Sequence, residues 1–338
     1  MTGIGDLRNK LLLGFAVGVA VVLALILVSD VHELQRSLRA FDWALIPLIL
    51  ALTLLNYALR FVKWHYYLGR IGARGVALRT SLGIFLSGLT MAMTPGKVGE
   101  LLKSVLLRRV IGTPIAVSAP IVMAERLTDG LALLVLSAGG LILYRVGVPV
   151  LALIALLAAA VVLVCVTEVG RRAVLGSAAR LPFVGSRMEH VHAVYESARS
   201  LLAPRPLGVG IGLGLVSWAG ECLAFFLVLV GLGLEPTFEL LLLASFVLGA
   251  STLIGSASLL PGGLGVADAT VAGLLLLTLP AGAVDRSEAI AATLLIRFCT
   301  LWFGAGLGVV TLLSTGTRLG RVPSDAVDPS PQRTPAAR

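Results

Sequence analysis

The sequence predicts an all-α integral membrane protein, with six full spans and two re-entrant hairpins arranged as an inverted repeat. Three observations predict this class: the composition, a series of apolar runs of membrane-spanning length, and two Pro-Gly breaks within apolar segments. Hydrophobic residues make up 57% of the 338 residues and charged residues only 13%, with a mean hydropathy of +0.98. A soluble domain is about one quarter charged, so lipid is the expected solvent of this chain.

The full spans are predicted from the length of the apolar runs, because a helix that crosses a bilayer needs about 20 apolar residues. The runs of this kind are 11–28, 41–62, 114–143, 150–168, 207–231 and 289–313. The first run follows Arg8 and Lys10 but is longer than the core of a signal peptide, so we expect it to be a retained helix.

The two hairpins are predicted from segments that stop at proline and glycine. The apolar segments 80–93 and 238–258 end at Pro95-Gly96 and Pro261-Gly262, and short helical runs over 98–110 and 264–279 follow them. Proline lacks a backbone donor and glycine ends helices, and a bilayer tolerates such breaks only where protein or a wet cavity satisfies the freed groups. This favours hairpins that turn near mid-membrane over kinked full spans, which are the alternative.

The surroundings of the two breaks predict an internal repeat. Pro95-Gly96-x-x-Gly99 is followed by Glu100, and Pro261-Gly262-x-x-Gly265 is followed by Asp268. Each break also has a charged residue in the span before it and an arginine in the span after it: Arg60 and Arg126 for the first, Glu221 and Arg297 for the second. We therefore expect repeats over about 41–143 and 207–313 in a membrane domain spanning 1–316, followed by a disordered tail over 317–338.

The distribution of basic residues predicts the orientation. On this topology 21 of the 27 basic residues fall on the inner side, and the outer loops hold only Arg36, Arg39, Arg145 and Arg286. The expected location is the inner (plasma) membrane, and by the positive-inside rule both termini are expected in the cytoplasm. Residues 169–206 are interpreted either as an amphipathic helix on the inner leaflet or as a solvated connector.

Charged residues within the spans are the main candidates for function. Glu125, Arg126 and Asp129 lie near the middle of 114–143, and the two carboxylates share a helix face. Burying one such charge costs about 3 kcal/mol on the lenient insertion scale. The group is interpreted either as a headgroup-binding or proton-coupled site or as a structural ion-pair network. Arg297 needs a partner, for which the candidates are Glu125, Asp129, Glu221 and Asp268.

The breaks add a second reason to expect an anion. Helices beginning near Lys97 and Leu264 would have their N-termini at mid-membrane, where free N–H groups and the helix dipole favour a negative group. With the arginines nearby, a phospholipid or polyprenyl-phosphate headgroup is the expected ligand; the alternative is that the glycines only allow close helix packing. The candidate substrate-binding residues are Arg60, Pro95, Gly96, Lys97, Gly99, Glu100, Glu125, Arg126, Asp129, Glu221, Pro261, Gly262, Gly265, Asp268 and Arg297.

Several kinds of site are not expected. The spans contain no histidine for a Ser–His site, the chain has no phosphate-loop motif for ATP, and Cys165, Cys222 and Cys299 lie singly in apolar runs. We therefore expect no catalytic residue, metal or cofactor. The net charge of +9 comes from loop residues that can meet anionic lipid, so nucleic acid is not an expected partner.

Taken together, these motifs resemble a known family. The segments that carry the resemblance are Leu59-Arg60 with Lys63-Trp64, Thr94-Pro95-Gly96-Lys97-Val98-Gly99-Glu100, Glu125-Arg126-x-x-Asp129 and Leu260-Pro261-Gly262-Gly263-Leu264-Gly265-Val266. Over about residues 10–315 the chain resembles the lysylphosphatidylglycerol synthetase transmembrane-region family, also called flippase-like. The resemblance implies a lipid flippase fold with two re-entrant subdomains. In the full-length synthetases the membrane part moves aminoacylated phosphatidylglycerol, which a separate soluble domain makes.

This chain departs from the family pattern in two respects. Only a short polar tail follows Leu313, so we expect the membrane part without the soluble synthetase domain. Asp268 stands where many relatives carry Glu.

The expected function is that of a lipid flippase or transporter without enzyme activity. Its substrate would be a phosphate-headed lipid: a phospholipid, an aminoacyl-phospholipid or a polyprenyl-phosphate-linked glycan, moved across the bacterial inner membrane. One alternative is a membrane scaffold for an envelope lipid- or glycan-modifying enzyme, and another is an intramembrane enzyme with Glu125, Asp129 or Glu221 as acid or base. The expected partners are membrane lipids, an envelope-biosynthesis enzyme and further copies of the chain.

Overall fold

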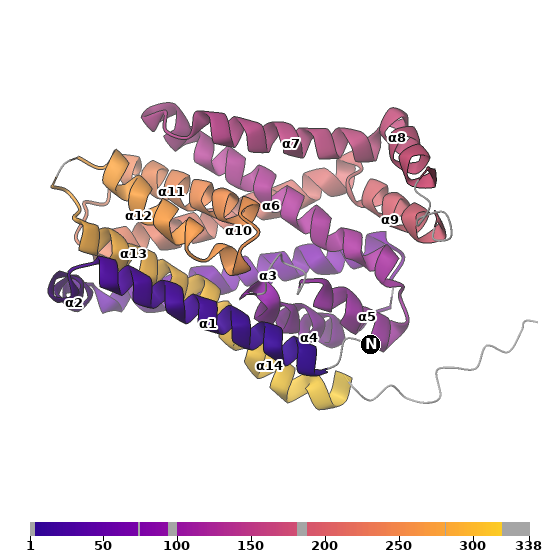
Figure 1. The fold of residues 1–338 in the computed structure, drawn as a ribbon, viewed down its shortest axis with the longest axis horizontal. Coiled ribbons are helices and arrows are strands. Elements are labelled where there is room, and N and C mark those ends of the chain that lie inside the picture. Colours follow the sequence, from indigo (N-terminus) through magenta and orange to yellow (C-terminus); the bar gives the residue numbers. More distant parts are fainter. Residues whose placement is uncertain (1–3, 74, 94–99, 181–187, 281, 320–338) are drawn as a thin grey trace, which may run out of the picture.

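The structure is a computed structural model that describes residues 4–73, 75–93, 100–180, 188–280 and 282–319. Within these ranges every regular element is a helix, which confirms the all-α class. The helices follow one another as α1 (Ile4–Val28), α2 (Val31–Ala40), η1 (Trp43–Leu45), α3 (Ile46–Arg70), α4 (Leu78–Leu89), η2 (Thr90–Met93), α5 (Leu102–Ile111), α6 (Ile115–Tyr144), α7 (Val148–Val166), α8 (Glu168–Ala179), α9 (Met188–Leu201), α10 (Pro204–Gly231), α11 (Phe238–Ala257), η5 (Pro261–Gly263), α12 (Val266–Thr278), α13 (Arg286–Arg297), η6 (Phe298–Trp302) and α14 (Phe303–Leu319) (Figure 1).

Seven of the described helical segments are long and apolar enough to cross a membrane, so the chain is a multi-pass membrane protein. Five of them match expected spans: Trp43–Arg70, Ile115–Tyr144, Val148–Val166, Pro204–Gly231 and Arg286–Ser314. The first expected span lies in α1, whose residues from Leu13 to Val28 are followed, after a bend of 104°, by α2.

The remaining two segments of spanning length are Phe238–Ala257 and Pro261–Thr278, which the sequence analysis assigned to the second hairpin. At 20 residues, α11 is about 30 Å long and is long enough for a full crossing. The helix before the first break, α4, has only 12 residues and is too short. The re-entrant assignments therefore stay predictions, and length favours the first hairpin more than the second.

The two helix pairs that flank the breaks lie toward opposite ends of the molecule. In Figure 1, α4 and α5 lie toward the end that holds α8 and α9, and α12 lies toward the end that holds α2. Each pair packs against the last long helix of the other half, α4 against α14 and α11 against α6. In each half of the described chain a pair of shorter helices thus lies between two long helices, and the two halves interlock; the inverted repeat itself stays a prediction.

Glycines allow this interlocking. A Cβ on Gly308 of α14 would lie 3.0 Å from the Leu86 carbonyl oxygen of α4, and one on Gly140 of α6 would lie 2.9 Å from the Leu242 carbonyl oxygen of α11. Helices in lipid associate through such close backbone approaches, because apolar surface gains little by leaving lipid. At the centre, α3 and α10 pack side by side, and Asn56 Nδ2 of α3 donates to the Ser217 carbonyl oxygen over 3.0 Å.

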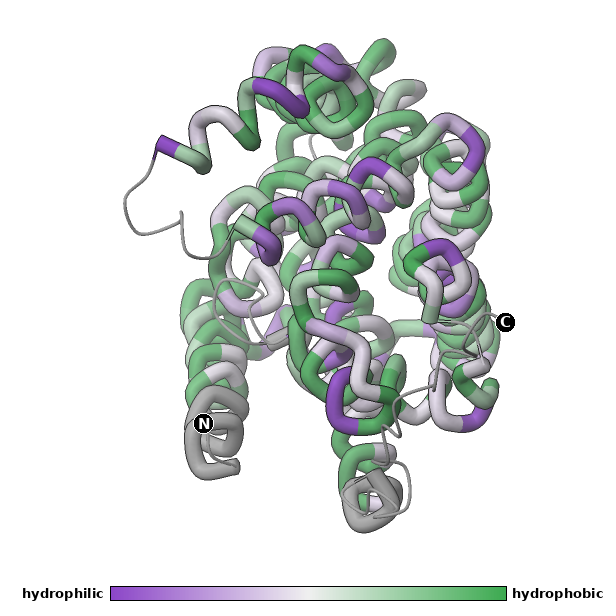
Figure 2. Tube along the Cα trace, turned by 90° about the vertical axis from the view of Figure 1, so that its right-hand side faces the viewer, coloured by the Kyte–Doolittle hydropathy of each residue, from purple (hydrophilic) through white to green (hydrophobic). Residues whose placement is uncertain are grey.

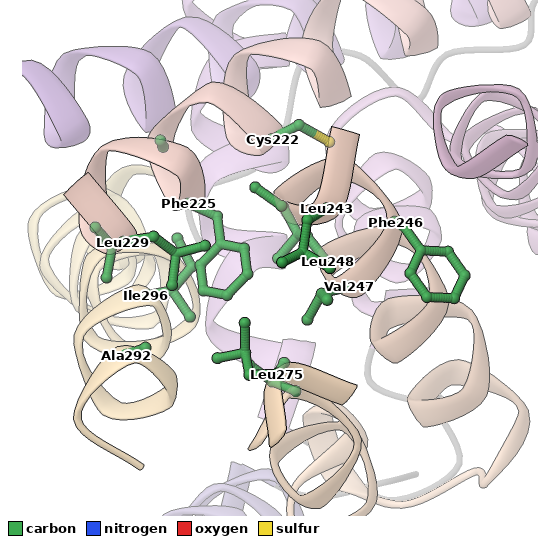
Figure 3. Packing of buried hydrophobic residues seen from close by; sticks show 14 of the residues in the cluster. Cys222, Phe225, Leu229, Leu243, Phe246, Val247, Leu248, Leu275, Ala292 and Ile296 are labelled. Atoms are coloured by element: carbon green, nitrogen blue, oxygen red, sulfur yellow. The ribbon is translucent and has the colours of Figure 1, made fainter. Parts of the chain in front are cut away.

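The largest apolar core lies among α10, α11, α12 and α13. Figure 3 shows Phe225, Val247, Leu275 and Ile296 converging from these four helices, and each of them is at most 1% exposed. Apolar residues predominate along the helices, with hydrophilic residues as short separate stretches (Figure 2). Helix α7 is the least buried of the seven candidate spans, since only 6% of its most apolar stretch is buried inside the structure.

The second break requires glycine. Gly262, Gly263 and Gly265 have φ values of 59°, 67° and 80°, in the left-handed region that side chains rarely adopt. A Cβ on Gly263 would also lie 3.1 Å from the backbone of Gly255. Because the turn extends over these residues, α12 begins at Val266, slightly later than expected.

The first break lies outside the described residues, and with it the candidates Pro95, Gly96, Lys97 and Gly99. The helix that follows it, α5, begins at Leu102. Most of the expected tail, from residue 320 onward, also lies outside the described residues.

The described part of residues 169–206 is mostly helical, in α8 and α9, and α9 is packed, which a solvated connector would not be. Helix α9 packs against α6 and buries Tyr195, Ala198 and Leu201. The Tyr195 hydroxyl lies 2.9 Å from the carbonyl oxygen of Val164, so it ties α9 to the end of α7. The apolar positions of α9 therefore serve tertiary packing.

Candidate functional site

A cavity of about 170 Å³ lies where the two halves meet. Its wall includes residues of α3, α4, α6 and α10 to α14, together with Gly262 and Gly263 of the second break. The charged side chains in the wall are Arg60, Glu100, Lys103, Arg126, Glu221 and Arg297. Five of them lie in α3, α5, α6, α10 and α13, and Glu100 lies just before α5.

Arg297 forms an ion pair with Asp268. Its Nε donates to Asp268 Oδ1 over 2.5 Å, while Asp268 Oδ2 accepts from the backbone N–H of Gly265 over 2.7 Å. The same carboxylate thus caps α12 and holds the arginine. Arg297 Nη1 also donates to the Gly262 carbonyl oxygen over 3.4 Å, so the guanidinium is fixed against the broken segment.

Arg126 forms the corresponding pair with Glu100 in the first half. Its Nε donates to Glu100 Oε2 over 2.9 Å. The glutamate side chain is 8% exposed and the arginine side chain 33% exposed. In both halves, therefore, the acid that directly follows the break binds the arginine of the next long helix.

Asp129 binds two cations of α3. Lys63 Nζ donates to Asp129 Oδ1, and Arg60 Nε lies 3.7 Å from Asp129 Oδ2. Lys63 is 1% exposed, so this lysine is buried completely. The pair fixes α3 against α6 and directs the second cation, Arg60, toward the cavity wall.

Glu125 binds Lys103 of α5. Lys103 Nζ donates to Glu125 Oε2 and lies 4.6 Å from the ring centroid of Trp64 and 5.6 Å from that of Phe85. Ring faces attract a cation by their quadrupole. The lysine therefore has one carboxylate and two aromatic partners in a site where it is 6% exposed.

Lys63 and Lys103 are the functional candidates that the sequence analysis missed. It counted them among the 21 basic residues of the inner side, whereas the structure places both as buried side chains within helices, Lys63 in α3 and Lys103 in α5. Their positions, three residues after Arg60 and three after Glu100, could have marked them as candidates, but spacing does not show which acids they bind. Each lysine pairs with a buried acid of α6: Lys63 with Asp129 and Lys103 with Glu125.

Glu221 differs from the other acids of the site. It is 6% exposed and lines the cavity, yet no hydrogen-bond or ion-pair partner contacts its carboxylate among the described residues. Two buried donors of the wall likewise have no acceptor in the described part of the chain: Trp218 Nε1 and Arg297 Nη2. A ligand with acceptor atoms in the cavity would give these two donors partners.

A short π-helix, η6, lies directly after Arg297. Its Thr300 carbonyl accepts from the Tyr57 hydroxyl of α3 over 2.7 Å, and both residues line the cavity. π-Helical turns occur frequently at functional sites. Arg297, directly before the turn, and Thr300 within it both line the cavity.

Most of the described candidates from the sequence meet around this cavity. Arg60, Glu100, Arg126, Glu221, Gly262 and Arg297 are in its wall, and Glu125, Asp129 and Asp268 lie behind the wall as ion-pair partners. Pro261 and Gly265 are not in the wall; they shape the break itself. Of the four acids proposed for Arg297, Asp268 is the partner.

The comparisons with known proteins match most of this chain. The family model described as "Lysylphosphatidylglycerol synthase TM region" matches residues 13–308. The chain belongs to this family. Two similar relatives from Methanothermobacter thermautotrophicus, each named "UPF0104 membrane protein", are 27% identical over 318 residues and 24% identical over 333 residues. The matches cover 88% and 90% of this chain, and 91% and 96% of the relatives. The cavity residues of this synthase TM-region protein therefore all lie within the matched region.

Proposed function

We propose that this membrane protein is a lipid transporter that holds a phosphate headgroup in the central cavity while the lipid crosses the bilayer. The observation that carries the proposal is the charge of the cavity wall. Four of its six charged side chains are basic, and Trp218 Nε1 and Arg297 Nη2 are donors that have no acceptor among the described residues. A phosphate group offers several acceptor oxygens and a negative charge to such a wall.

The placement of the acids supports an anionic ligand. Three of the ion-pair acids, Glu125, Asp129 and Asp268, stand behind the wall, and their basic partners Lys103, Arg60 and Arg297 face the cavity. The acids lower the cost of burying the cations without occupying the cavity. An arrangement made only to lock the helices together would not need to leave donors unused.

The orientation follows from the basic loops. The end of the molecule that holds α4, α5, α8 and α9 (Figure 1) carries Arg108, Arg109, Arg171, Arg172 and Arg199 on those helices. By the positive-inside rule we infer that this end is cytoplasmic. Because α1 begins and α14 ends at this end, both termini would then be cytoplasmic, in a plasma (inner) membrane. We infer further that this chain is a non-catalytic membrane domain.

The experiment is a translocation assay in proteoliposomes with fluorescent phosphatidylglycerol, using dithionite to quench label in the outer leaflet. Wild-type protein is expected to expose most of the inner-leaflet label. Arg297→Gln should reduce the rate by at least about tenfold, because one bond between a charged donor and the headgroup contributes about 1.5–3 kcal/mol. Arg286→Gln, at the exposed start of the same helix, is the matched control and should retain the wild-type rate.

A second lipid tests the headgroup. Fluorescent glucosylceramide has a headgroup of similar polarity without phosphate, and it is expected to stay in its leaflet. Equal transport of both lipids would show that the phosphate is not recognised. Unchanged transport by Arg297→Gln would remove this arginine from the transport mechanism.

A further inference from the structure

The charged groups of the cavity and of the layer behind it are balanced in number. Among the described residues they comprise five cations, Arg60, Lys63, Lys103, Arg126 and Arg297, and five acids, Glu100, Glu125, Asp129, Glu221 and Asp268. With every group ionised, the net charge of this set is zero. An anionic headgroup entering the cavity would therefore leave one buried negative charge in excess.

A buried excess charge is costly in a membrane protein, because a charge at mid-membrane lacks the water that would solvate it. Four of the five acids cannot easily lose theirs, because each is in direct contact with a lysine or arginine. Glu221 is the exception, since no cation lies within ion-pair distance of its carboxylate in the described part of the chain. Protonation of this carboxylate would therefore restore the charge balance without breaking an ion pair.

The surroundings of Glu221 fit a group that changes its charge with the ligand. The titratable groups that act on it are Arg60 and Tyr57 from α3, Arg297 from α13 and Asp129 from α6. The wall residues of α11, the remaining large neighbour of α10, are uncharged, and several carry hydroxyl groups. Arg60 and Arg297 are also the cations that would bind the headgroup. A bound anion would draw these cations away from Glu221 electrostatically and favour its neutral form.

We propose that Glu221 is a proton site coupled to the headgroup site. Its carboxylate takes up one proton from solvent when a phosphate-headed lipid enters the cavity, and the carboxylic acid returns that proton to solvent when the lipid leaves. The charge of the site is the same with and without ligand. The inference rests on the proposed function and extends it: lipid movement would be linked to proton movement, so a proton gradient could drive it.

The test is isothermal titration calorimetry of the purified full-length protein in detergent, with dihexanoyl phosphatidylglycerol as the probe. The titration is repeated in two buffers of different ionisation enthalpy, and the difference gives the protons taken up per probe bound. Wild type is expected to take up about one proton, and its affinity should fall about tenfold per pH unit once Glu221 is ionised in the free protein. Glu221→Gln should bind with no proton uptake and with an affinity independent of pH. Glu196→Gln, an exposed change on α9, should behave as wild type.

The outcomes separate the two proposals. Binding by wild type without proton uptake, or equal uptake by Glu221→Gln, would overturn the proton site and leave the headgroup site intact. Absence of any binding by wild type would overturn the proposed function, and the coupling with it. A further titration uses dihexanoyl phosphatidylcholine. Tighter binding of this lipid than of the anionic probe, together with weaker binding of it by Glu221→Gln, would mean that Glu221 recognises an ammonium group. The proton role would then be wrong.

Discussion

Arg297 and Asp268 are joined by a 2.5 Å hydrogen bond from the guanidinium Nε to the carboxylate Oδ1, across 29 residues of sequence. The relationship recurs in the first half, where Arg126 Nε donates to Glu100 over 2.9 Å across 26 residues. In each case the acid follows a Pro-Gly break and the arginine lies in the next long helix. The first pair ties α12 and the second break to the cavity wall, and the second pair ties Glu100 to α6 in the same wall.

The first prediction concerns the pair of Arg297 and Asp268. Asp268→Asn keeps the shape of the side chain but leaves Arg297 with an uncompensated buried charge, so the free energy of unfolding should fall by about 3 kcal/mol. The measurement is denaturation in mixed micelles. Asp268→Asn combined with Arg297→Gln should recover most of the loss, because no unpaired charge is then left. A double variant whose loss equals the sum of the two single losses would mean that the residues do not interact.

The second prediction tests the packing of α10 against α3 and α6. A Cβ on Gly210 would lie 2.0 Å from Tyr67 Oη and 2.9 Å from Thr128 Cγ2, so Gly210→Ala should destabilise the protein by about 1–3 kcal/mol. Gly208→Ala, two residues earlier in the same helix, meets nothing within 4 Å and should be neutral or slightly stabilising. Thermal unfolding in detergent measures both. Equal melting temperatures for the two variants would contradict the described packing.

The third prediction concerns Trp218, whose Nε1 donor has no acceptor in the described chain. Trp218→Phe keeps an aromatic ring next to Arg60, which lies 6.0 Å from the tryptophan ring centroid, but removes the donor. Binding of dihexanoyl phosphatidylglycerol should weaken about tenfold, since a hydrogen bond to a charged group contributes about 1.5–3 kcal/mol.

The control for this variant is Trp43→Phe. Trp43 is 56% exposed and its Nε1 donates to the Leu38 carbonyl, away from the cavity. Its loss should leave probe binding unchanged. Wild-type affinity in Trp218→Phe would show that this donor does not meet the headgroup.

The fourth prediction is a pH dependence at Glu168, the first residue of α8, which lies outside the spans. A hydrogen bond from Arg171, together with the charges of Arg171 and Arg199, holds the pKa of Glu168 below its ordinary value of 4.5. The pKa is lower in the folded state, so the contribution of these contacts to stability is complete above pH 4.5 and is lost as the pH falls through the folded-state pKa.

The measurement compares melting temperatures of wild type and Glu168→Gln across this range. The wild type should be the more stable at neutral pH, with the difference disappearing in acid. Glu189→Gln, an exposed change on α9, should show no such pH-dependent difference. A difference between wild type and Glu168→Gln that persists unchanged in acid would mean that the ionised carboxylate is not its source.

The sequence by itself determined the class of the protein, most of its spans and the position of the second break. These features are local. A run such as 150–168 has the length that a spanning helix needs whatever surrounds it, and Pro261 with Gly262 interrupts a helix in any context. The acids and arginines of the site were also visible, because a charge within an apolar run has few explanations.

Only the tertiary structure decided how these groups are used. Helical spacing could not show that Arg297 binds Asp268 and not Glu221, since that choice depends on how α12 and α13 pack against each other. For the same reason the burial of Lys63 against Asp129, 66 residues away, could not be read from the sequence. Ion pairs between helices depend on the rotation and depth of each helix, which interlocking of the two halves fixes. The carboxylate of Glu221 is left without a partner by that packing, and this is the feature from which the proposed proton site follows.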